Sequence, residues 1–323
     1  MKTMLIAGFG DLGLAIAKQA QADPGYKNLS ILALRRNPPQ PTNLLKPNES
    51  TNSELPPNVT WLAADLADRA SIAAVLATHT QIDSVVYCAA PNERTEQAYR
   101  STYVTGLQNL VGVLDDLDIK HTGGAPQKPY SQEPYPQKPY PQRPRILFVS
   151  STAVYDSQAQ GVFDETSPTE PRGFNGKVLC EAEAWLLSNW PEATVLRLSG
   201  IYGPTKQRLL QSIKEGQSTT PDSEDYIANR IHLDDAARAV LHLLKGKHSG
   251  IFLGTDSHPI PLRALYETLA DLLGAPAPGI AAPSPMMGKK QLSNQKLLRT
   301  GFELKWPDCI EGYKAMIASR DQI

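Results

Sequence analysis

The sequence lacks the features that mark several large protein classes. Its 323 residues include only three cysteines, Cys88, Cys180 and Cys309, which are far apart and form neither a C-x-x-C pair nor a Cys/His cluster. This spacing excludes a disulfide framework and a zinc site, and it is typical of a reduced, cytoplasmic protein. The histidines have no metal-ligand spacing either, so we expect no bound metal.

An excess of one charge and long apolar runs are missing as well. Lys and Arg number 32 against 33 Asp and Glu, so the chain has no global attraction for nucleic acid or for an anionic membrane. No apolar run approaches the ~20 residues of a membrane span. We therefore expect a soluble protein with a small-molecule substrate, a monomer or a homodimer, that binds neither nucleic acid nor membranes.

The most informative stretch is residues 3–17, TMLIAGFGDLGLAIA, in which an apolar run leads into three spaced glycines. Apolar residues at helical spacing follow, so the pattern predicts strand, tight turn and helix. Gly8 would allow the sharp turn, Gly10 the close approach of a pyrophosphate, and Gly13 tight packing of the helix on the sheet. The phosphates would bind N–H groups at the helix N-terminus. The sequence thus predicts a dinucleotide site formed by Gly8, Phe9, Gly10, Asp11, Leu12 and Gly13.

A secretory signal is the alternative interpretation of this stretch. Lys2, the apolar run and the small residues Ala20 and Ala22 resemble such a signal and its cleavage site. Asp11 within the apolar region and the three glycines argue against it. We therefore interpret the stretch as the first strand and helix of a cytoplasmic, enzyme-like domain.

Two arginines, Arg35 and Arg36, follow the second expected strand, residues 29–34. A site for NAD usually has an Asp or Glu here, which binds the ribose hydroxyls. Guanidinium groups instead suit the 2′-phosphate of NADP. The sequence therefore favours NADP, with NAD possible, although the pair could also be an ordinary solvated strand end.

Two later strand ends are expected beside the same cofactor. The strand over 59–63 is followed by Asp65, which could contact the adenine or equally serve as a helix cap. The buried strand over 82–88 runs into two alanines, whose small side chains would let the cofactor pass over the strand end. The cofactor residues predicted here are Asp65, Leu66, Ala89 and Ala90.

Two stretches predict surface insertions. Residues 37–58 are rich in Pro, Asn and Ser and contain little that could pack. Residues 123–144 contain the five-residue repeat QKPYS, QEPYP, QKPYP, in which the proline content favours extended polyproline II. We interpret the repeat, 127–144, as a disordered surface insertion; a docking segment for a proline-reading partner is the alternative.

The rest of the chain alternates predicted helices and strands. Helices are expected over 67–77, 95–117 and 177–189, strands over 145–151 and 194–198, and a polar loop over 161–176. The helix over 95–117 carries one stripe of side chains for core packing, Tyr99, Tyr103, Leu107, Leu110 and Leu114. This alternation predicts an α/β fold with a doubly wound parallel sheet.

Five motifs occur in an order shared with a known family: GFGDLG at 8–13, SSTAVY at 150–155, LRLSGIYGP at 196–204, NRIHLDDAARA at 229–239 and LLRTGFELKWPD at 297–308. The chain resembles the extended short-chain dehydrogenase/reductase superfamily, in its NAD(P)-dependent epimerase/dehydratase group, and within it an atypical subgroup of small bacterial proteins. The resemblance implies a Rossmann-type sheet with a smaller C-terminal substrate lobe. Residues 1–199 and 226–248 would form the NAD(P)-binding domain, and 200–225 and 249–323 the lobe.

The resemblance also implies a catalytic set of Ser or Thr, Tyr and Lys, with the Tyr four residues before the Lys. Ser151 matches the Ser, with Thr152 beside it, and Lys177 matches the Lys and would also bind the cofactor. The tyrosine is absent, because position 173 is Gly173.

Tyr103 is the candidate replacement for the missing phenol. It occupies the position where the family often has an Asn near the catalytic lysine. In these enzymes an adjacent ammonium makes a phenol, with a reference pKa near 10, usable as an acid or base. The alternative is that Tyr103 is one more packed aromatic residue of its helix.

The implied function is that of an NAD(P)-dependent oxidoreductase or epimerase/dehydratase-like enzyme acting on a small polar metabolite, such as a sugar derivative. A non-catalytic NADP-binding sensor or regulatory protein is the alternative, which Gly173 favours. The substrate contacts that we predict are Thr152, Tyr202, Arg208 and Arg230. We expect His232 to be structural and Asp234 to cap the helix that follows it.

Overall fold

A computed structural model of the protein describes residues 2–39, 55–79, 81–122, 143–284 and 287–320. The chain divides into two compact units. Unit 1 comprises Met1–Ser150, Lys177–Val195 and Val240–Gly250, and unit 2 comprises Ser151–Gly176, Leu196–Ala239 and Ile251–Ile323. The boundaries of these two units differ from the boundaries expected from the sequence for the domain and its lobe. The expected insertions 37–58 and 127–144 lie for the most part outside the described residues.

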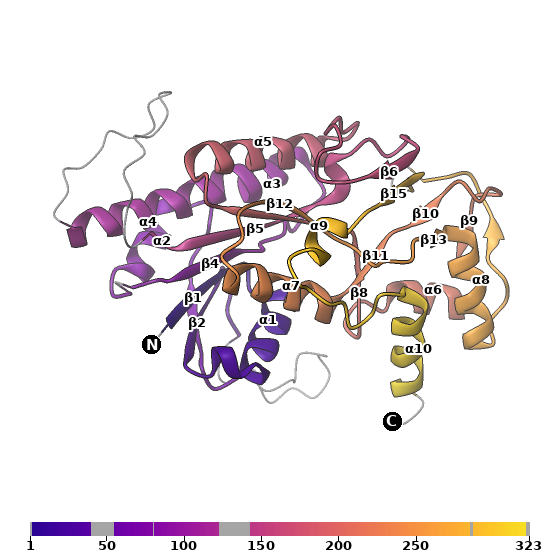
Figure 1. The fold of residues 1–323 in the computed structure, drawn as a ribbon, viewed down its shortest axis with the longest axis horizontal. Coiled ribbons are helices and arrows are strands. Elements are labelled where there is room, and N and C mark those ends of the chain that lie inside the picture. The colour runs from indigo at the N-terminus through magenta and orange to yellow at the C-terminus, as the bar shows by residue number, and fades with distance from the viewer. Residues whose placement is uncertain (1, 40–54, 80, 123–142, 285–286, 321–323) are drawn as a thin grey trace. The chain divides into compact units, whose positions relative to one another are not determined.

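A seven-stranded sheet organises the fold (Figure 1), with the strand order β12-β7-β5-β4-β1-β2-β3. Its strands are β1 (Lys2–Ala7), β2 (Leu29–Arg35), β3 (Val59–Ala63), β4 (Ser84–Tyr87), β5 (Arg145–Ser151), β7 (Thr194–Leu198) and β12 (Gly250–Gly254). All neighbouring pairs from β3 to β5 are parallel. The order reverses between β1 and β4, as in doubly wound dinucleotide-binding sheets. The predicted fold class is confirmed.

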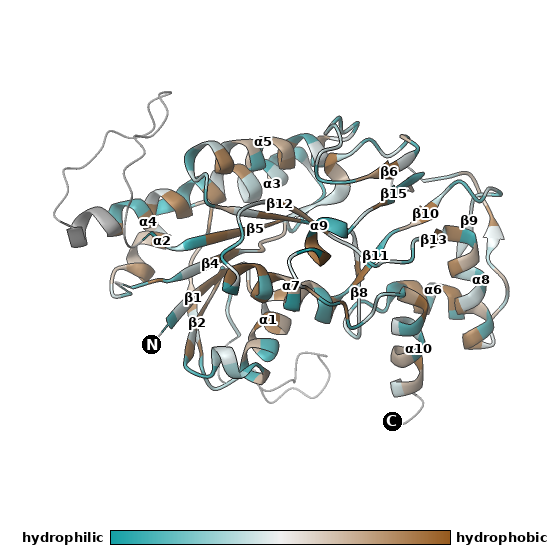
Figure 2. Cartoon of the chain, in the orientation of Figure 1, coloured by the Kyte–Doolittle hydropathy of each residue, from teal (hydrophilic) through white to brown (hydrophobic). Residues whose placement is uncertain are grey.

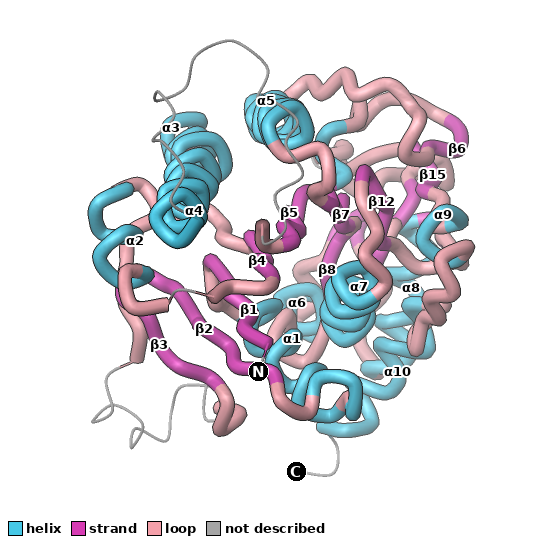
Figure 3. The backbone as a smooth tube through the Cα atoms, turned by 60° about the vertical axis from the view of Figure 1, so that its left-hand side comes forward, coloured by secondary structure: helices cyan, strands magenta, loops and turns pink. Residues whose placement is uncertain are grey.

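The central strands are apolar along their length because helices cover both faces of the sheet. Residues 4–7 of β1 and 31–34 of β2 are at most 3% exposed, and their apolar character is visible in Figure 2. In unit 1, α1 (Asp11–Ala22) lies on one face, and α2 (Arg69–Leu76), α4 (Gly106–Thr122) and α5 (Phe174–Asn189) lie on the other (Figure 3).

The single α-helix expected over 95–117 is wrong in its first half, where the structure has α3 (Glu96–Tyr99), the π-helical η3 (Arg100–Thr105) and then α4. Tyr87, buried in β4, gives the physical reason. Its hydroxyl donates to the carbonyl of Thr102 inside the π-turn, and a Cβ at Gly106 would lie 2.5 Å from the Tyr87 oxygen. A side chain that enters the helical hydrogen-bond ladder distorts it in this way. The π-turn contains Tyr103.

Unit 2 is built from short strand pairs and helices. The strand pairs are β6 (Gly161–Phe163) with β15 (Lys290–Leu292), β8 (Gly200–Tyr202) with β11 (Arg230–His232), β9 (Thr219–Thr220) with β14 (Gly279–Ile280), and β10 (Ile227–Ala228) with β13 (Ile260–Pro261). Its helices are α6 (Arg208–Lys214), α8 (Leu262–Leu273), α9 (Gln295–Leu298) and α10 (Cys309–Arg320), and α7 (Leu233–Lys245) runs through both units. The loop expected over 161–176 was therefore wrong at its start, because β6 is defined by a partner strand far along the chain.

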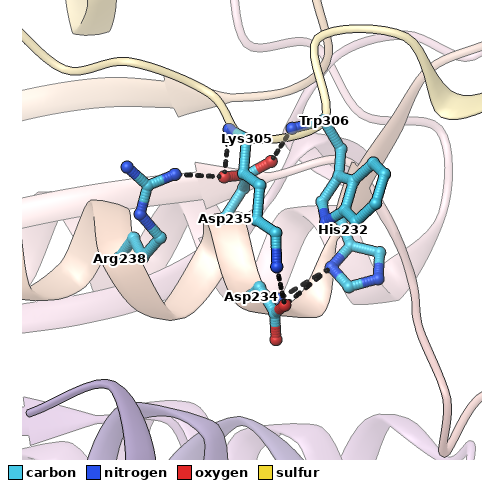
Figure 4. Close-up of polar contacts among 6 residues, drawn as sticks. All are labelled: His232, Asp234, Asp235, Arg238, Lys305 and Trp306. Atoms are coloured by element: carbon cyan, nitrogen blue, oxygen red, sulfur yellow. Dashed lines mark hydrogen bonds and ion pairs between the residues drawn. The ribbon is translucent and has the colours of Figure 1, made fainter. Parts of the chain in front are cut away.

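A buried carboxylate, Asp235 in the first turn of α7, fixes the carboxyl-terminal segment of unit 2 (Figure 4). It is 0% exposed and accepts the backbone N–H groups of Lys305 and Trp306, both at 2.8 Å. Arg238 Nη1 donates to the same carboxylate at 3.0 Å. Three donors thus share one buried anion, which is the arrangement that makes a buried charge tolerable.

Asp234 does not cap α7 as expected, because the helix begins one residue earlier. The Asp234 N–H instead donates to Nδ1 of His232 at 3.1 Å, so the imidazole is the acceptor at this end of the helix. His232 is buried, in the structural role that we predicted. The Asp234 carboxylate makes only long contacts, 3.5 Å to the ammonium of Lys305 and 3.8 Å to the imidazole.

We expect Asp235→Asn to lower the free energy of unfolding by about 2–4 kcal/mol, because an amide offers one acceptor oxygen to three buried donors. Asp234→Asn is the matched control and should cost less than about 1 kcal/mol, since its ion pair with Lys305 is long and partly exposed. Chemical denaturation of both variants tests this. Equal losses in the two variants would show that Asp235 does not hold the segment.

Candidate dinucleotide site

The glycine turn lies at the carboxyl end of β1, between the ends of β2 and β4. The N–H groups of Gly8 and Phe9 donate to the carbonyl of Leu34 at 2.9 and 3.2 Å. Gly8 has φ +90°, and a Cβ there would lie 2.2 Å from the Cα of Ala89. Only glycine satisfies both constraints. This is the point where the strand order reverses, and α/β sheets bind ligands at that point.

The turn leads into the 12-residue helix α1, whose N-cap residue is Gly10. Glycine offers no side-chain acceptor to the first-turn N–H groups, and a Cβ at this position would meet no atom within 4 Å. Next to it, Asp11 and Leu12 are half-buried. An open helix N-terminus of this kind suits a phosphate group. The turn therefore fits the pyrophosphate of a dinucleotide, in a space that a larger side chain would fill.

The Phe9 side chain packs inside unit 1, beneath the turn. It is 4% exposed, and its ring meets Trp61 of β3 edge-on at 5.1 Å between centroids. A Cβ at Gly13 would lie 3.1 Å from the same ring. Phe9 and Gly13 are thus brought together as packing partners, and only the backbone of Phe9 is placed to face a cofactor.

The two arginines lie at the same edge of the sheet. Arg35 is the exposed last residue of β2, and Arg36 Nε lies 3.2 Å from Asp65 Oδ2. The Arg36 and Asp65 side chains are 59% and 39% exposed, so this ion pair contributes less than about 1 kcal/mol. Arg36 could therefore exchange the carboxylate for a phosphate at little cost. From the sequence, Arg36 was expected at the 2′-phosphate and Asp65 at the adenine, whereas the structure pairs the two side chains.

The other predicted cofactor residues lie after β3 and β4 in the same unit. The carbonyl of Leu66 accepts Asn109 Nδ2 at 3.0 Å, which ties this strand end to α4. Ala89 touches the glycine turn, as described above, and Ala90 beside it is exposed. The close packing of Gly8 on Ala89 is thus present whether or not a cofactor is bound.

The elements that carry Tyr103 and Lys177 touch each other in unit 1. Arg100 of η3 forms an ion pair with Glu181 of α5 at 2.8 Å, and the exposed Lys177 lies one helical turn before Glu181. The Tyr103 ring packs against Phe148 at 6.1 Å between centroids. Burial raises the pKa of Tyr103 to about 12, so its phenol would need a nearby cation to act as an acid or base.

Ser151 and the turn that follows it belong to unit 2. The Ser151 hydroxyl accepts the Ala153 N–H at 3.2 Å and so caps the 3-10 turn η4 (Thr152–Val154). A Cβ at Gly176 would lie 2.2 Å from the Ala153 carbonyl, which requires glycine there. At Gly173 a Cβ would meet only the Asn175 side-chain amide. The backbone therefore does not require glycine at the position where the family has its tyrosine.

The predicted substrate contacts also lie in unit 2, and with Thr152 they stay predictions. Tyr202 is 2% exposed and stacks on Tyr313 at 4.4 Å between centroids, so its ring is part of the core. Arg208 is exposed at the first residue of α6. The guanidinium of Arg230 lies over Gly200, where a Cβ would be 2.6 Å from Nη1.

One buried acid that sequence analysis missed is Asp256, beside Arg230. It is 1% exposed, and burial raises its pKa to about 7. Its Oδ1 accepts the Arg230 N–H at 3.3 Å, whereas its Oδ2 has no partner among the described residues. A single Asp after an apolar strand gave no signal of this environment.

Two features are absent from the described part of the chain. It holds no group of three or more His, Cys, Asp or Glu side chains arranged to bind a metal ion. Its helices include none long and apolar enough to cross a membrane.

The doubly wound sheet and the glycine turn at its reversal define a dinucleotide-binding α/β protein. The profile of the NAD dependent epimerase/dehydratase family matches residues 4–252, and the chain belongs to that family. Protein YeeZ of Escherichia coli K12 is 34% identical over 170 residues, which are 51% of this chain and 59% of YeeZ. The chain thus spans about three-fifths of the length of the curated relatives that it matches.

Solved structures share the fold over nearly the whole chain. A protein from Methylobacillus flagellatus, described as an NAD-dependent epimerase/dehydratase, is 29% identical with a TM-score of 0.70 over 99% of both chains. The dTDP-glucose 4,6-dehydratase of Bacillus anthracis in complex with NAD is 15% identical with a TM-score of 0.76, covering 100% of this chain and 97% of that one. The UDP-glucose 4-epimerase of Thermotoga maritima with UDP-glucose is 17% identical with a TM-score of 0.74, covering 100% and 99%. The last two likenesses show the fold alone.

We expect Gly8→Ala and Gly10→Ala to separate folding from binding. Gly8→Ala should lower the free energy of unfolding by roughly 2–4 kcal/mol, because the positive φ and the contact with Ala89 both oppose a side chain. Gly10→Ala should change stability by less than about 1 kcal/mol but weaken dinucleotide binding at least tenfold, or about 1.4 kcal/mol. Urea denaturation and calorimetric titration with NADPH measure the two effects. Unchanged binding in Gly10→Ala would exclude the turn as the pyrophosphate site.

Proposed function

We propose that the protein is a cytoplasmic NAD(P)-dependent oxidoreductase or epimerase/dehydratase-like enzyme, monomeric or homodimeric, acting on a small polar metabolite such as a sugar derivative. The observation that carries the proposal is the glycine turn, which is open at Gly10 and required by the backbone at Gly8. Membership of the NAD dependent epimerase/dehydratase family supports the cofactor class. The sugar nucleotides named for the two neighbours support the substrate class.

We propose NADP as the cofactor, because Arg35 and Arg36 stand at the position where an NAD site usually has an Asp or Glu. That carboxylate binds the ribose hydroxyls of NAD. The guanidinium groups of the two arginines would hold the 2′-phosphate, and the glycine turn would hold the pyrophosphate. The residues proposed around the rest of the dinucleotide are Asp65, Leu66, Ala89 and Ala90. When bound, the nicotinamide of such a cofactor accepts or donates a hydride.

Three residues would act on the substrate. The Ser151 hydroxyl accepts one backbone N–H in the structure and keeps its own proton as a donor to a substrate oxygen. Lys177 would bind the ribose and place a positive charge near Tyr103, which favours the phenolate and lowers the pKa of the phenol. Tyr103 would then hold or move the proton in place of the missing tyrosine. The contacts proposed around the substrate are Thr152, Tyr202, Arg208 and Arg230.

A non-catalytic NADP-binding sensor or regulatory protein is the second candidate, and Gly173 is the observation that favours it. The backbone there would accept a side chain, so folding does not explain the loss of the phenol. A protein that only binds the cofactor has no need of an acid or base at this point. Ser151 and Lys177 would then serve to hold the dinucleotide and its turn.

We expect NADPH to bind at least tenfold more tightly than NADH, a difference of about 1.4 kcal/mol. The Arg35→Ala/Arg36→Ala double variant should remove this preference, because it removes the charges that would face the 2′-phosphate. Arg69→Ala is the control; it removes a partly exposed arginine elsewhere in unit 1 that pairs with Asp116 and donates to the Gly112 carbonyl. Calorimetric titration of both cofactors measures the ratio, and equal affinities in the wild type would refute NADP selectivity.

We expect Tyr103→Phe to lower NADP-dependent turnover by roughly 10²–10⁴, the usual contribution of a general acid or base. Gly173→Tyr should compensate by restoring a tyrosine four residues before Lys177. Gly173→Phe supplies the same ring without the hydroxyl and is its control. Steady-state rates of reduction of a panel of sugar-derived carbonyl compounds would be compared. Tight NADP binding without turnover in the wild type would favour the sensor.

A further inference from the structure

Lys290, the first residue of β15, is a buried lysine in unit 2. Its side chain is 9% exposed, and β15 lies beside β6 in a parallel pair that places Lys290 opposite Gly161 (Figure 1). The backbone around it is fixed by Asn229, whose Nδ2 donates to the Lys290 carbonyl at 2.9 Å and whose Oδ1 accepts the Leu292 N–H at 2.8 Å. The position of this residue is therefore set by the fold.

The Lys290 ammonium forms no hydrogen bond or ion pair with the residues that the structure describes. The acid that acts on it is Asp156, but this carboxylate is already held by Arg172, at 2.6 Å from Nε and 3.0 Å from Nη2. Asp156 also accepts the Gln158 N–H at 2.9 Å. Two cations thus share one anion, and one positive charge is left without a counter-charge.

This arrangement is costly for folding alone. A largely buried charge without a hydrogen-bonding partner loses part of its hydration and gains no protein partner in exchange. Burial lowers the pKa of Lys290, and Asp156 only partly offsets this effect. An apolar side chain of similar length would avoid the cost, so the lysine points to a ligand that supplies the missing negative charge.

Two glycines lie beside Lys290. A Cβ at Gly288 would lie 3.5 Å from Lys290 Nζ and 3.1 Å from the Ser157 carbonyl, so Nζ lies close to the backbone here. Gly161, the exposed register partner, has no side chain, and a Cβ there would meet no atom within 4 Å. Backbone atoms of Ser157 and Gly288 thus border the ammonium, and the position of a side chain at Gly161 is open.

We propose that the Lys290 ammonium binds an anionic group of the substrate, a phosphate or a carboxylate, beside the backbone of Ser157 and Gly288. The proposal rests on the proposed function, since it gives the small polar metabolite a negative charge. The segment after the Ser151 turn is held to this site within unit 2, because the Lys289 N–H donates to the Ser157 carbonyl at 3.2 Å.

The adjacent residue provides a matched control. Lys289 forms an ion pair with Asp225 at 2.9 Å and lies over the ring of Tyr226 at 5.2 Å. The charge of Lys289 is already compensated by Asp225. Removing the Lys289 ammonium changes the net charge of this segment by the same amount as removing the Lys290 ammonium, but leaves the proposed site intact. Lys289→Met and Lys290→Met therefore differ only in which ammonium is lost.

The test is calorimetric titration of the full chain with inorganic phosphate and with acetate, in the absence of dinucleotide. The wild type and Lys289→Met should bind the same anion with equal affinity, whereas Lys290→Met should lose at least tenfold. Lys290→Arg, which keeps the charge, should retain part of the binding. Preference for phosphate or for acetate identifies the group that the site takes.

Thermal melting provides a second measurement on the same variants. Lys290→Met should melt no lower than the wild type, because it removes an uncompensated buried charge. A wild type that binds neither anion, or a Lys290→Met variant that binds as tightly as the wild type, would overturn the proposal. So would equal losses of binding in Lys289→Met and Lys290→Met. NADPH titration of the same samples reports on the unit 1 residues and tests the proposed function separately.

Discussion

The close approach of Gly8 to Ala89 is the contact on which the dinucleotide site depends. It occurs where β1 and β4 end side by side and the strand order reverses, so that the chain must turn sharply into α1. A side chain at Gly8 would force the two strand ends apart and move the helix N-terminus. With glycine there, the first turn of α1, the end of β2 with its arginines and the small residues after β4 meet at one edge of the sheet.

Local patterns were sufficient to predict this edge of the sheet. The strands over 145–151 and 194–198 have the bounds that their apolar runs predicted, because strands covered on both faces are apolar throughout. The glycine turn was equally readable, since the backbone geometry that it needs admits few residues. The roles of Arg36 and Asp65 were harder to assign, because each was interpreted alone and the structure pairs them.

Features that depend on a distant partner could not be predicted. The π-turn around Tyr103 is set by Tyr87 of β4, which no helical periodicity reveals. β6 is a strand only because β15 pairs with it, and Asp235 receives donors from a segment 70 residues further along the chain. The sequence does not distinguish the adjacent Lys289 and Lys290, whereas the structure pairs Lys289 with Asp225 and buries Lys290.

The buried Lys290 and the glycine at position 173 point to different functions. Gly173 stands where the resemblance places the proton-transferring tyrosine, and the backbone there would accept a side chain. Lys290, in contrast, is a largely buried cation without a hydrogen bond or ion pair among the described residues. A chain selected only for stability and cofactor binding would gain from an apolar residue at 290. Because natural proteins retain such costs mainly at functional sites, the buried Lys290 supports the ligand site proposed in unit 2. The difference between an enzyme and a sensor then rests on the phenol of Tyr103 and on whether a cation lowers its pKa of about 12.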